Sequence, residues 1–416
     1  MLNTNLNIAH FSTSDKGGAG MAAARLHQLL YDNGITSCFI SKYLFNESMI
    51  NTKVINQYSQ QNLIRKAINR FNPSLYQQLS RRFTSKDAKH DYFSFPYGNP
   101  SLHLQKEYQQ ANIIHVHWAV EDFLDWPTFF SDTDKKFVFT LHDMHLFTGG
   151  CHHADECTNF QSDCSYCPQL NEAGKQIAMK MLLSKLACLQ GHHSRRIKII
   201  APSSWMIEQS RSSKLFSNFQ HFKIPNIVPH TTFLPNNFVS EKLKLAGNRK
   251  RILFVSNDID NYRKGTSLLA EACKHLDANE VVLMTVGKVK GQLQDNMMQI
   301  DFGFLKSEET MASIFAAADL FVLPSMAENF PNTIVESLLQ GTPVIATKVG
   351  GIVEQLDESN GILISPSSTH LVEAIVKALF NRGWDRLAIQ QAARIRYSPK
   401  QILADHLNVY SSFFHD

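Results

Sequence analysis

The sequence predicts an α/β protein made of two domains, each built on a parallel β-sheet. The chain has 416 residues, more than one hydrophobic core usually organises, so two domains of about 200 residues each are favoured. Short apolar segments bounded by turn residues alternate with segments of helical periodicity, which is typical of parallel strands joined by crossover helices. The alternation occurs in two series, and each series therefore predicts one domain.

The first series begins near the amino terminus. A strand is expected at 7–11 and a helix at 20–33, with Leu26 and Leu30 among the apolar residues on one side of that helix. Later strands of the same sheet are expected at 37–41, 113–117, 137–141 and 198–201.

The second series follows a segment rich in proline. Segment 223–237 contains Pro225, Pro229 and Pro235 and has almost no helical periodicity, so we place the interdomain linker there. Strands of the second series are expected at 252–255, 281–286, 320–323 and 343–346. The expected domains are therefore 1–236 and 237–398, followed by a final helix from residue 399.

The composition excludes several classes of protein. With 44% hydrophobic and 19% charged residues, the chain is an ordinary globular protein, and a net charge of +4 is too small to indicate a nucleic-acid partner. Residues 1–13 lack a basic segment followed by an apolar one, and no apolar run approaches the ~18 residues of a membrane span. We expect a cytoplasmic chain.

Glycines follow the first expected strand. Ligands of open α/β sheets bind at the carboxyl ends of the strands, so two such domains facing each other across a cleft would hold one ligand between them. Lys16-Gly17-Gly18-Ala19-Gly20 opens directly into a helix, where glycines such as Gly18 let a substrate approach the backbone and the free amides favour an anion or a sugar hydroxyl. The spacing is not the Gly-x-Gly-x-x-Gly dinucleotide fingerprint, and a tight turn is the alternative interpretation.

Histidines follow two other strands of the first domain. The strand at 113–117 ends in His115 and His117, and the next strand is followed by His142 and Asp143. Side chains alternate along a strand, so His115 and His117 lie on the same face, and a packed, hydrogen-bonded histidine is the alternative for either. Together they favour binding of a substrate hydroxyl, or proton handling, on the acceptor side.

The second domain holds an acidic motif. Its strand at 320–323 is followed by Glu328 in a loop and Glu336 in the next helix, and two such carboxylates can reach different parts of one ligand. Asn332 and Thr333 lie at the start of the helix, where free amides would hold a diphosphate. The alternative is that Asn332 or Thr333 is an N-cap and that Glu336 is an exposed helix residue.

Two basic residues precede another helix of the second domain. Arg263 and Lys264 come before Gly265, which opens the helix at 266–274. A cation there faces the same phosphates and would neutralise charge that builds on a nucleotide leaving group. A lysine before a helix is commonly a solvated surface charge, but beside the acidic motif it indicates a donor site.

These motifs resemble those of the retaining family 4 glycosyltransferases along nearly the whole chain. The resemblance implies a GT-B fold, in which two Rossmann-like domains face each other across a cleft and a last helix at 399–416 packs back on the first domain. The Glu-x7-Glu signature of the family matches Glu328 and Glu336. It implies that Glu336 binds the donor ribose and that Glu328 binds the transferred sugar.

Other positions match the family as well. Lys264 matches its phosphate-binding lysine, and His117 matches the histidine that contacts the transferred sugar. The family's glycine-rich loop and its Gly-Gly-x-x-Glu element match Gly17, Gly18 and Gly20, and Gly350, Gly351 and Glu354, respectively.

One family residue is missing. Members commonly carry an arginine six residues before the lysine, whereas this strand ends Val255-Ser256-Asn257-Asp258. Two explanations stay open: Arg263 supplies the charge from the other side of Lys264, or the loop is rebuilt.

The resemblance also implies an activity. It is strongest to bacterial exopolysaccharide and colanic-acid-type enzymes, which share the sequence at 140–143 and 147–151 and the later cysteines. It implies retaining hexosyl transfer from a UDP- or GDP-sugar to a hydroxyl of a lipid-linked cell-envelope polysaccharide precursor. We expect no catalytic metal, because basic groups and backbone amides would stabilise the departing diphosphate. A sugar-nucleotide epimerase of the same fold and a non-catalytic, sugar-nucleotide-binding scaffold are the alternatives.

Four cysteines lie close together in the sequence. Cys151, Cys157, Cys164 and Cys167 share one segment, and only the last pair has the Cys-x2-Cys spacing of a zinc knuckle. In a reducing compartment such a group favours a metal over disulfides. A structural zinc, disulfides and a metal-free turn stay open, whereas a catalytic zinc is disfavoured because four thiolates would close its coordination.

Segment 61–89 is basic and amphipathic. It has two interpretations: a helix that lies on the inner face of the cytoplasmic membrane, where a lipid-linked acceptor would be found, or a solvated helix that packs on its domain. Its basic residues are Arg65, Lys66, Arg70, Arg81, Arg82, Lys86 and Lys89.

Overall fold

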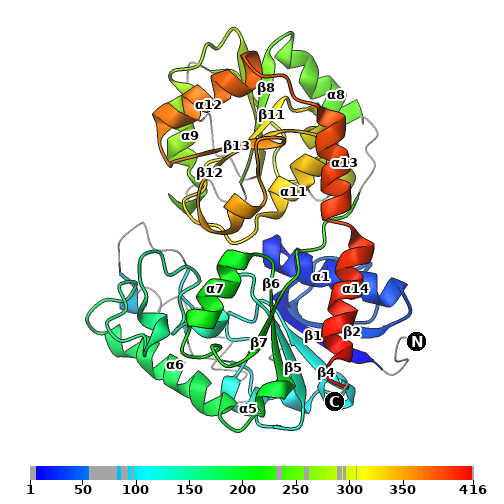
Figure 1. Cartoon of the computed structure of the whole chain (residues 1–416), viewed down its shortest axis with the longest axis vertical. Coiled ribbons are helices and arrows are strands. Elements are labelled where there is room, and N and C mark those ends of the chain that lie inside the picture. Colours follow the sequence, from blue (N-terminus) through cyan, green and yellow to red (C-terminus); the bar gives the residue numbers. More distant parts are fainter. Residues whose placement is uncertain are drawn as a thin grey trace, which may run out of the picture. The chain divides into compact units, whose positions relative to one another are not determined.

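The computed structural model divides the chain into two compact units. It describes residues 6–55, 82–85, 92–95, 98–230, 237–256, 262–287, 293, 297–305 and 307–414. The first unit comprises residues 1–227 and 400–416, and the second comprises residues 228–399 (Figure 1). Apart from Arg82, the basic residues of segment 61–89 lie outside the described part of the chain.

The first unit is built on a seven-stranded sheet in the order β3-β2-β1-β4-β5-β6-β7, and every neighbouring pair is parallel. The strands are β1 (Asn7–Ser14), β2 (Thr36–Tyr43), β3 (Thr52–Val54), β4 (Ile113–Val116), β5 (Lys136–Thr140), β6 (Ile197–Ala201) and β7 (Gln220–Lys223). The helices are α1 (Gly17–Asp32), α4 (Lys106–Gln110), α5 (Trp126–Phe129), α6 (Lys175–Leu189), α7 (Ser204–Ser212) and α14 (Pro399–Ser411).

Helices cover both faces of this sheet. On one face, α1 and α14 pack against the strands, and Leu30, Leu407 and Tyr410 share a core with Ile8 and Ile113. The carboxyl-terminal helix is therefore part of the first unit, to which its buried apolar side chains belong (Figure 1).

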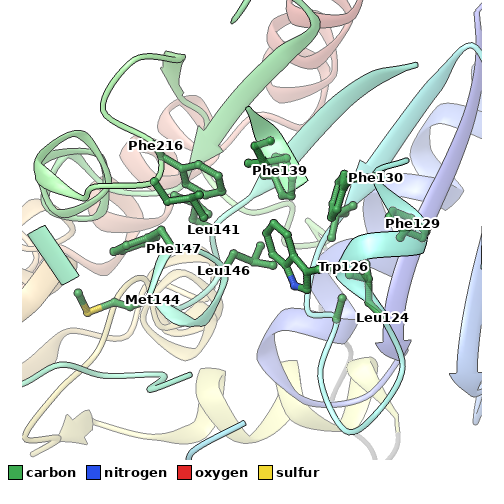
Figure 2. Close-up of a cluster of buried hydrophobic side chains, with 14 of the residues drawn as sticks. Leu124, Trp126, Phe129, Phe130, Phe139, Leu141, Met144, Leu146, Phe147 and Phe216 are labelled. Atoms are coloured by element: carbon green, nitrogen blue, oxygen red, sulfur yellow. The ribbon is translucent and has the colours of Figure 1, made fainter. Parts of the chain in front are cut away.

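The opposite face is covered by α4, α5, α6 and α7 over a core rich in aromatic rings. Figure 2 shows this cluster, in which Trp126, Phe139, Phe216 and Phe147 lie in succession. Ring centroids are 6.1 Å apart for Trp126 and Phe139, 5.2 Å for Phe139 and Phe216, and 6.2 Å for Phe216 and Phe147. The cluster anchors the segment that follows β5.

The second unit contains a six-stranded sheet in the order β10-β9-β8-β11-β12-β13, and all of its pairs are parallel. The strands are β8 (Lys250–Ser256), β9 (Val281–Gly287), β10 (Gln299–Asp301), β11 (Leu320–Leu323), β12 (Val344–Thr347) and β13 (Gly361–Ile364). The helices are α8 (Asn237–Leu243), α9 (Thr266–Cys273), α10 (Glu308–Ala317), α11 (Asn332–Leu339), α12 (Ser368–Phe380) and α13 (Arg386–Arg396). Separate apolar cores fill the two faces.

The predicted class, two α/β domains with parallel sheets, is confirmed. The first unit ends at Ile227, earlier than the expected residue 236, because Val228 is buried in the core of the second unit. β1 runs on to Ser14 beyond the predicted end at residue 11, because the polar residues Ser12 and Thr13 are also buried. Within the described residues, no helix is long and apolar enough to cross a membrane.

Candidate functional site

The turn from β1 into α1 contains a glycine with close neighbours and a glycine with open surroundings. A Cβ at Gly20 would lie 2.3 Å from the Ser14 carbonyl oxygen, so glycine lets the helix pack against the end of β1. A Cβ at Gly18 would meet nothing within 4 Å. The helix starts at Gly17, earlier than the predicted residue 20, and Lys16 makes no side-chain cap. Gly18 therefore lies in the first turn of the helix, where the surroundings are open.

His115 is a packed histidine. Its Nδ1 lies 2.8 Å from the Tyr410 hydroxyl of α14, and its Nε2 lies 2.7 Å from the Thr140 hydroxyl of β5. The side chain is fully buried, and burial lowers its pKa well below the usual value. Both ring nitrogens have protein partners, so His115 joins the sheet to the last helix.

His117 is the middle member of a row of three imidazoles. Its Nε2 lies 3.0 Å from His10 Nδ1, and its Nδ1 lies 3.3 Å from His142 Nε2. His117 is only 2% exposed, whereas His142 is partly exposed. Burial lowers the pKa of His117 and His10 well below the usual value and that of His142 to about 4, so all three rings are neutral near pH 7.

Asp143 orients other side chains of the first unit. Its Oδ2 accepts a hydrogen bond from Trp118 Nε1 at 3.0 Å and lies 2.7 Å from His152 Nδ1, and its Oδ1 accepts from the His145 backbone at 2.9 Å. Burial acts to raise the pKa of Asp143, but His152 and His145 hold it below its usual range. The carboxylate thus fixes the segments that follow β4 and β5.

In the second unit, the predicted basic and acidic residues meet. Glu328 Oε1 lies 2.7 Å from Lys264 Nζ and 3.3 Å from Arg263 Nη1, and it accepts a hydrogen bond of 3.2 Å from the Ser325 hydroxyl. Arg263 also donates to the Ala327 carbonyl at 3.0 Å. The loops after β8 and β11 are therefore joined through one carboxylate.

Glycines allow these loops to approach. Gly265 has a φ of +68°, and a Cβ there would lie 1.8 Å from the Pro324 carbonyl oxygen. Gly350 has a φ of +50°, and a Cβ there would lie 1.9 Å from the Glu328 carbonyl oxygen, which also accepts the Gly351 N–H at 3.2 Å. Neither the left-handed backbone nor the spacing admits a side chain, so both glycines fix the position of the charged cluster.

The start of α11 differs from the N-cap alternative. The N-cap is Pro331, and Asn332 and Thr333 are the first two helical residues. Thr333 and Glu336 are partly exposed and lie one turn apart on the same face of the helix, whereas Asn332 is buried. The backbone amides at the start of α11 and the Glu336 carboxylate thus follow β11 at the carboxyl edge of the sheet.

The second unit also matches a known family. Residues 249–381 match the family model described as glycosyl transferases group 1. Residues 249–381 therefore form a glycosyl transferases group 1 domain.

Proteins similar to this chain include two that are described as biosynthesis glycosyltransferases. The chain is 26% identical over 297 residues to a protein of Escherichia coli described as the colanic acid biosynthesis glycosyl transferase WcaC, which covers 67% of this chain and 69% of that protein. It is 29% identical over 178 residues to a Bacillus subtilis protein described as the teichuronic acid biosynthesis glycosyltransferase TuaC, which covers 41% of this chain and 45% of that one.

Solved structures of the same fold cover nearly the whole glycosyltransferase. Sucrose-phosphate synthase of Thermosynechococcus elongatus superposes with a TM-score of 0.66 at 17% identity, over 99% of both chains. Anabaena HepE in complex with UDP-glucose superposes with a TM-score of 0.61 at 16% identity, over 98% of this chain and 100% of that one. These similarities establish the fold.

The four clustered cysteines, for which a structural zinc, disulfides and a metal-free turn stay open, line one cavity of the first unit. All seven cysteines are free thiols, so the described chain holds no disulfide. Within the described residues, the group of metal-type ligands whose atoms lie within 4.8 Å of one another consists of His10, His115 and His117. Those rings lie side by side, with interplanar angles of 23° to 37°. Both ring nitrogens of His115 are occupied by the Tyr410 and Thr140 hydroxyls, which leaves no nitrogen of His115 for a metal.

Sequence reasoning missed two residues of the site. His10 lies inside β1, and its proximity to His117 depends on the pairing of β1 with β4, which no local pattern reveals. Ser325, which donates to Glu328, follows β11 directly and could have been found from that position. The place of the missing family arginine, Asp258, lies outside the described residues.

Proposed function

We propose that this glycosyltransferase moves a hexose from a UDP- or GDP-sugar onto a hydroxyl of a lipid-linked precursor of a cell-envelope polysaccharide, with retention and without a catalytic metal. The main support is the cluster of Lys264, Arg263 and Glu328 beside the first turn of α11. Two cations share one carboxylate, so the three side chains carry an excess positive charge that a diphosphate would neutralise.

Each group of this cluster has a proposed task. The amides of Asn332 and Thr333 bind the diphosphate at the positive end of α11, and Glu336 binds the ribose hydroxyls. Lys264 stabilises the charge on the departing phosphate oxygen, with Arg263 in support. Glu328 positions Lys264 and accepts a hydrogen bond from a hydroxyl of the transferred sugar.

The proposed reaction is a front-face displacement, as in the family that the chain resembles. The acceptor oxygen attacks the anomeric carbon from the side on which the diphosphate departs. The bond between that carbon and the phosphate oxygen breaks, and the acceptor proton passes to the phosphate oxygen. Lys264 then interacts more strongly with the product diphosphate than with the donor, which favours the transition state.

On the acceptor side, both ring nitrogens of His117 are already engaged. We therefore propose that His142 meets the substrate hydroxyl and that His117, the family's sugar-contacting position, holds the ring of His142. Asp143 fixes the surrounding segments through Trp118 and His152. Gly18 lets a substrate approach the first turn of α1.

The metal independence of this reaction rests on the basic cluster. Of the Asp-x-Asp pairs, which bind metal in other glycosyltransferases, Asp132 and Asp134 are exposed and precede β5, away from the carboxyl ends of the strands. Asp258 and Asp260 follow β8 outside the described residues. Transfer assayed with and without a chelator decides the point: activity that vanishes with chelator and returns with Mg²⁺ or Mn²⁺ contradicts metal independence.

The donor and the reaction type can be tested together. A panel of UDP- and GDP-sugars should contain one that raises the melting temperature, because a ligand bound only by the folded state stabilises it. That sugar should then be transferred to a lipid-linked glycan, with the anomeric configuration read by NMR. An inverted linkage contradicts retention. An epimerised nucleotide sugar supports the epimerase alternative, and binding without turnover supports the scaffold.

A further inference from the structure

The four clustered cysteines surround one small cavity in the segment after β5. Cys151, Cys164 and Cys167 are buried, and Cys157 is half-buried. All four line the cavity together with apolar groups such as Phe160. Three other cysteines of the chain, Cys38, Cys188 and Cys273, lie elsewhere and line no part of it. The fold thus brings four thiols that are not adjacent in the sequence to one cavity.

A backbone donor points at a sulfur of the cluster. The Gly149 N–H donates to Cys164 Sγ at 3.2 Å, whereas the Leu170 N–H donates to the Cys167 carbonyl oxygen at 3.2 Å. Burial raises the pKa of the Cys164 thiol to about 11, and the Gly149 N–H acts against that rise because it stabilises the negative charge of a thiolate. Such outer hydrogen bonds accompany metal-bound thiolates and fix their orientation.

The Cys-x2-Cys turn has an uncommon backbone. Cys164 has a φ of +57° and Tyr166 a φ of +53°, although neither is glycine. Residues in this conformation cost free energy and persist where the surroundings enforce them, commonly at sites that bind something. Here the conformation turns Cys164 and Cys167 towards the same cavity.

A buried cation lies beside the cluster. Lys185 Nζ donates to the carbonyl oxygens of His145 at 2.7 Å and Thr148 at 3.0 Å, and its charge interacts with the Cys164 and Cys151 sulfurs. A buried ammonium group is costly unless negative charge lies close by. The Asp143 carboxylate already interacts with the Lys185 charge. Four thiolates around Zn²⁺ carry a net charge of −2, so a zinc site would add to this negative charge.

From these observations we propose that Cys151, Cys157, Cys164 and Cys167 bind one structural zinc ion as thiolates. Binding converts four thiols into thiolates and releases four protons. Among the described residues, no three of these sulfurs lie within 4.8 Å of one another. Zinc binding would therefore draw the sulfurs inward across the cavity to a zinc–sulfur distance of about 2.3 Å. Four thiolates complete a tetrahedral shell, so this zinc takes no part in the transfer reaction and instead holds the segment next to Asp143 in place.

The first test is the metal content of the full chain, purified without chelator. We expect about one zinc per chain, which leaves when the thiols are titrated with a mercurial. Cobalt can then replace zinc, and the near-ultraviolet charge-transfer absorption of a cobalt–thiolate bond would identify sulfur ligands. Zinc below about a tenth of an equivalent, with four freely reacting thiols, overturns the proposal.

Matched variants locate the metal. Cys164→Ser and Cys167→Ser should lose zinc and melt at lower temperature, while Cys188→Ser, in α6 of the same unit, should keep its zinc. Donor binding should persist in all three, because it belongs to a separate core. Zinc retained by both loop variants but lost by His10→Ala would place the metal on the imidazoles and refute the assignment. If the loop variants do not fold, the metal content and cobalt spectrum of the unaltered chain still decide the question.

Discussion

The side chains at the carboxyl ends of the strands differ between the two sheets: the second unit has a cluster of ion pairs there, and the first has a row of neutral imidazoles. In the second unit, Arg263, Lys264 and Glu328 form ion pairs and remain between 11% and 26% exposed. In the first unit, His117 bonds ring to ring with His10 and His142, and burial keeps these imidazoles neutral. Charged groups near water can exchange a carboxylate partner for a phosphate, whereas neutral imidazoles suit hydroxyls. Under the proposed function, two similar sheets would thus bind different ligands because the residues after their strands differ.

The largest effect should follow loss of charge in the second unit. Lys264→Ala removes the cation proposed to stabilise the leaving diphosphate, and we expect turnover to fall by about 10²- to 10³-fold, or about 2.7–4 kcal/mol of transition-state stabilisation. The measurement is kcat at saturating donor and acceptor.

Lys274→Ala is the matched control, because Lys274 lies at the other end of α9 and pairs with the exposed Glu271. It should turn over like the unaltered enzyme. If the Lys264 variant retains near-normal kcat while folded, the charged cluster is structural and the comparison between the two sheets fails.

A smaller effect on transfer is expected from substitutions in the row of three neutral imidazoles of the first unit. His142→Ala should lower transfer by about 10- to 100-fold with donor affinity unchanged, because His142 is the partly exposed member. His117→Asn, which keeps hydrogen-bonding groups in the middle of the row, should cost less. Donor affinity is measured by calorimetry and transfer by initial rates. The opposite ranking, with His117 dominant, would restore direct contact between His117 and the sugar.

The pH dependence of stability should distinguish the units as well. Burial lowers the pKa of His142 and His406 from 6.5 to about 4. A histidine with a lowered folded-state pKa stabilises the fold fully above its unfolded value of 6.5, and this contribution is lost as the pH falls through 4. We expect the melting temperature to fall across that range, with uptake of about one proton on unfolding for each such imidazole.

Thermal unfolding across this pH range checks the expectation. The exposed His275 belongs to the second unit, and His275→Gln should leave the pH dependence unchanged. His406→Leu should reduce it. A melting temperature that stays constant down to pH 4 would show that the imidazoles of the first unit are not neutral and buried in solution.

The sequence predicted the central strands of both sheets and the charged residues of the second unit, but it did not predict the edge strands or the contacts between histidines. β11 was predicted with its observed bounds because a buried parallel strand is a continuous apolar run. The four edge strands β3, β7, β10 and β13 were missed, because each has only three or four residues. Lys264 and Glu328 could be assigned to one site because they lie in the segments that follow β8 and β11 of the same sheet. The link from His10 to His117 could not be foreseen, because it depends on which strands pair.

The smallest effect is expected from substitutions of two glycines in the first turn of α1. The variant at Gly20 tests the packing of the helix on β1, and the variant at Gly18 tests the access of a ligand to the backbone. Gly20→Ala places a Cβ 2.3 Å from the Ser14 carbonyl oxygen, so we expect the free energy of unfolding to fall by about 1–3 kcal/mol. Gly18→Ala meets nothing within 4 Å and should change stability by no more than about 0.5 kcal/mol. If a substrate approaches the backbone at residue 18, this second variant should nevertheless raise KM several-fold. Chemical denaturation and steady-state kinetics on both variants check the pair. An unchanged KM for Gly18→Ala would show that the glycine-rich turn serves only the packing of α1 on β1, and it would confine ligand recognition in the first unit to the histidines.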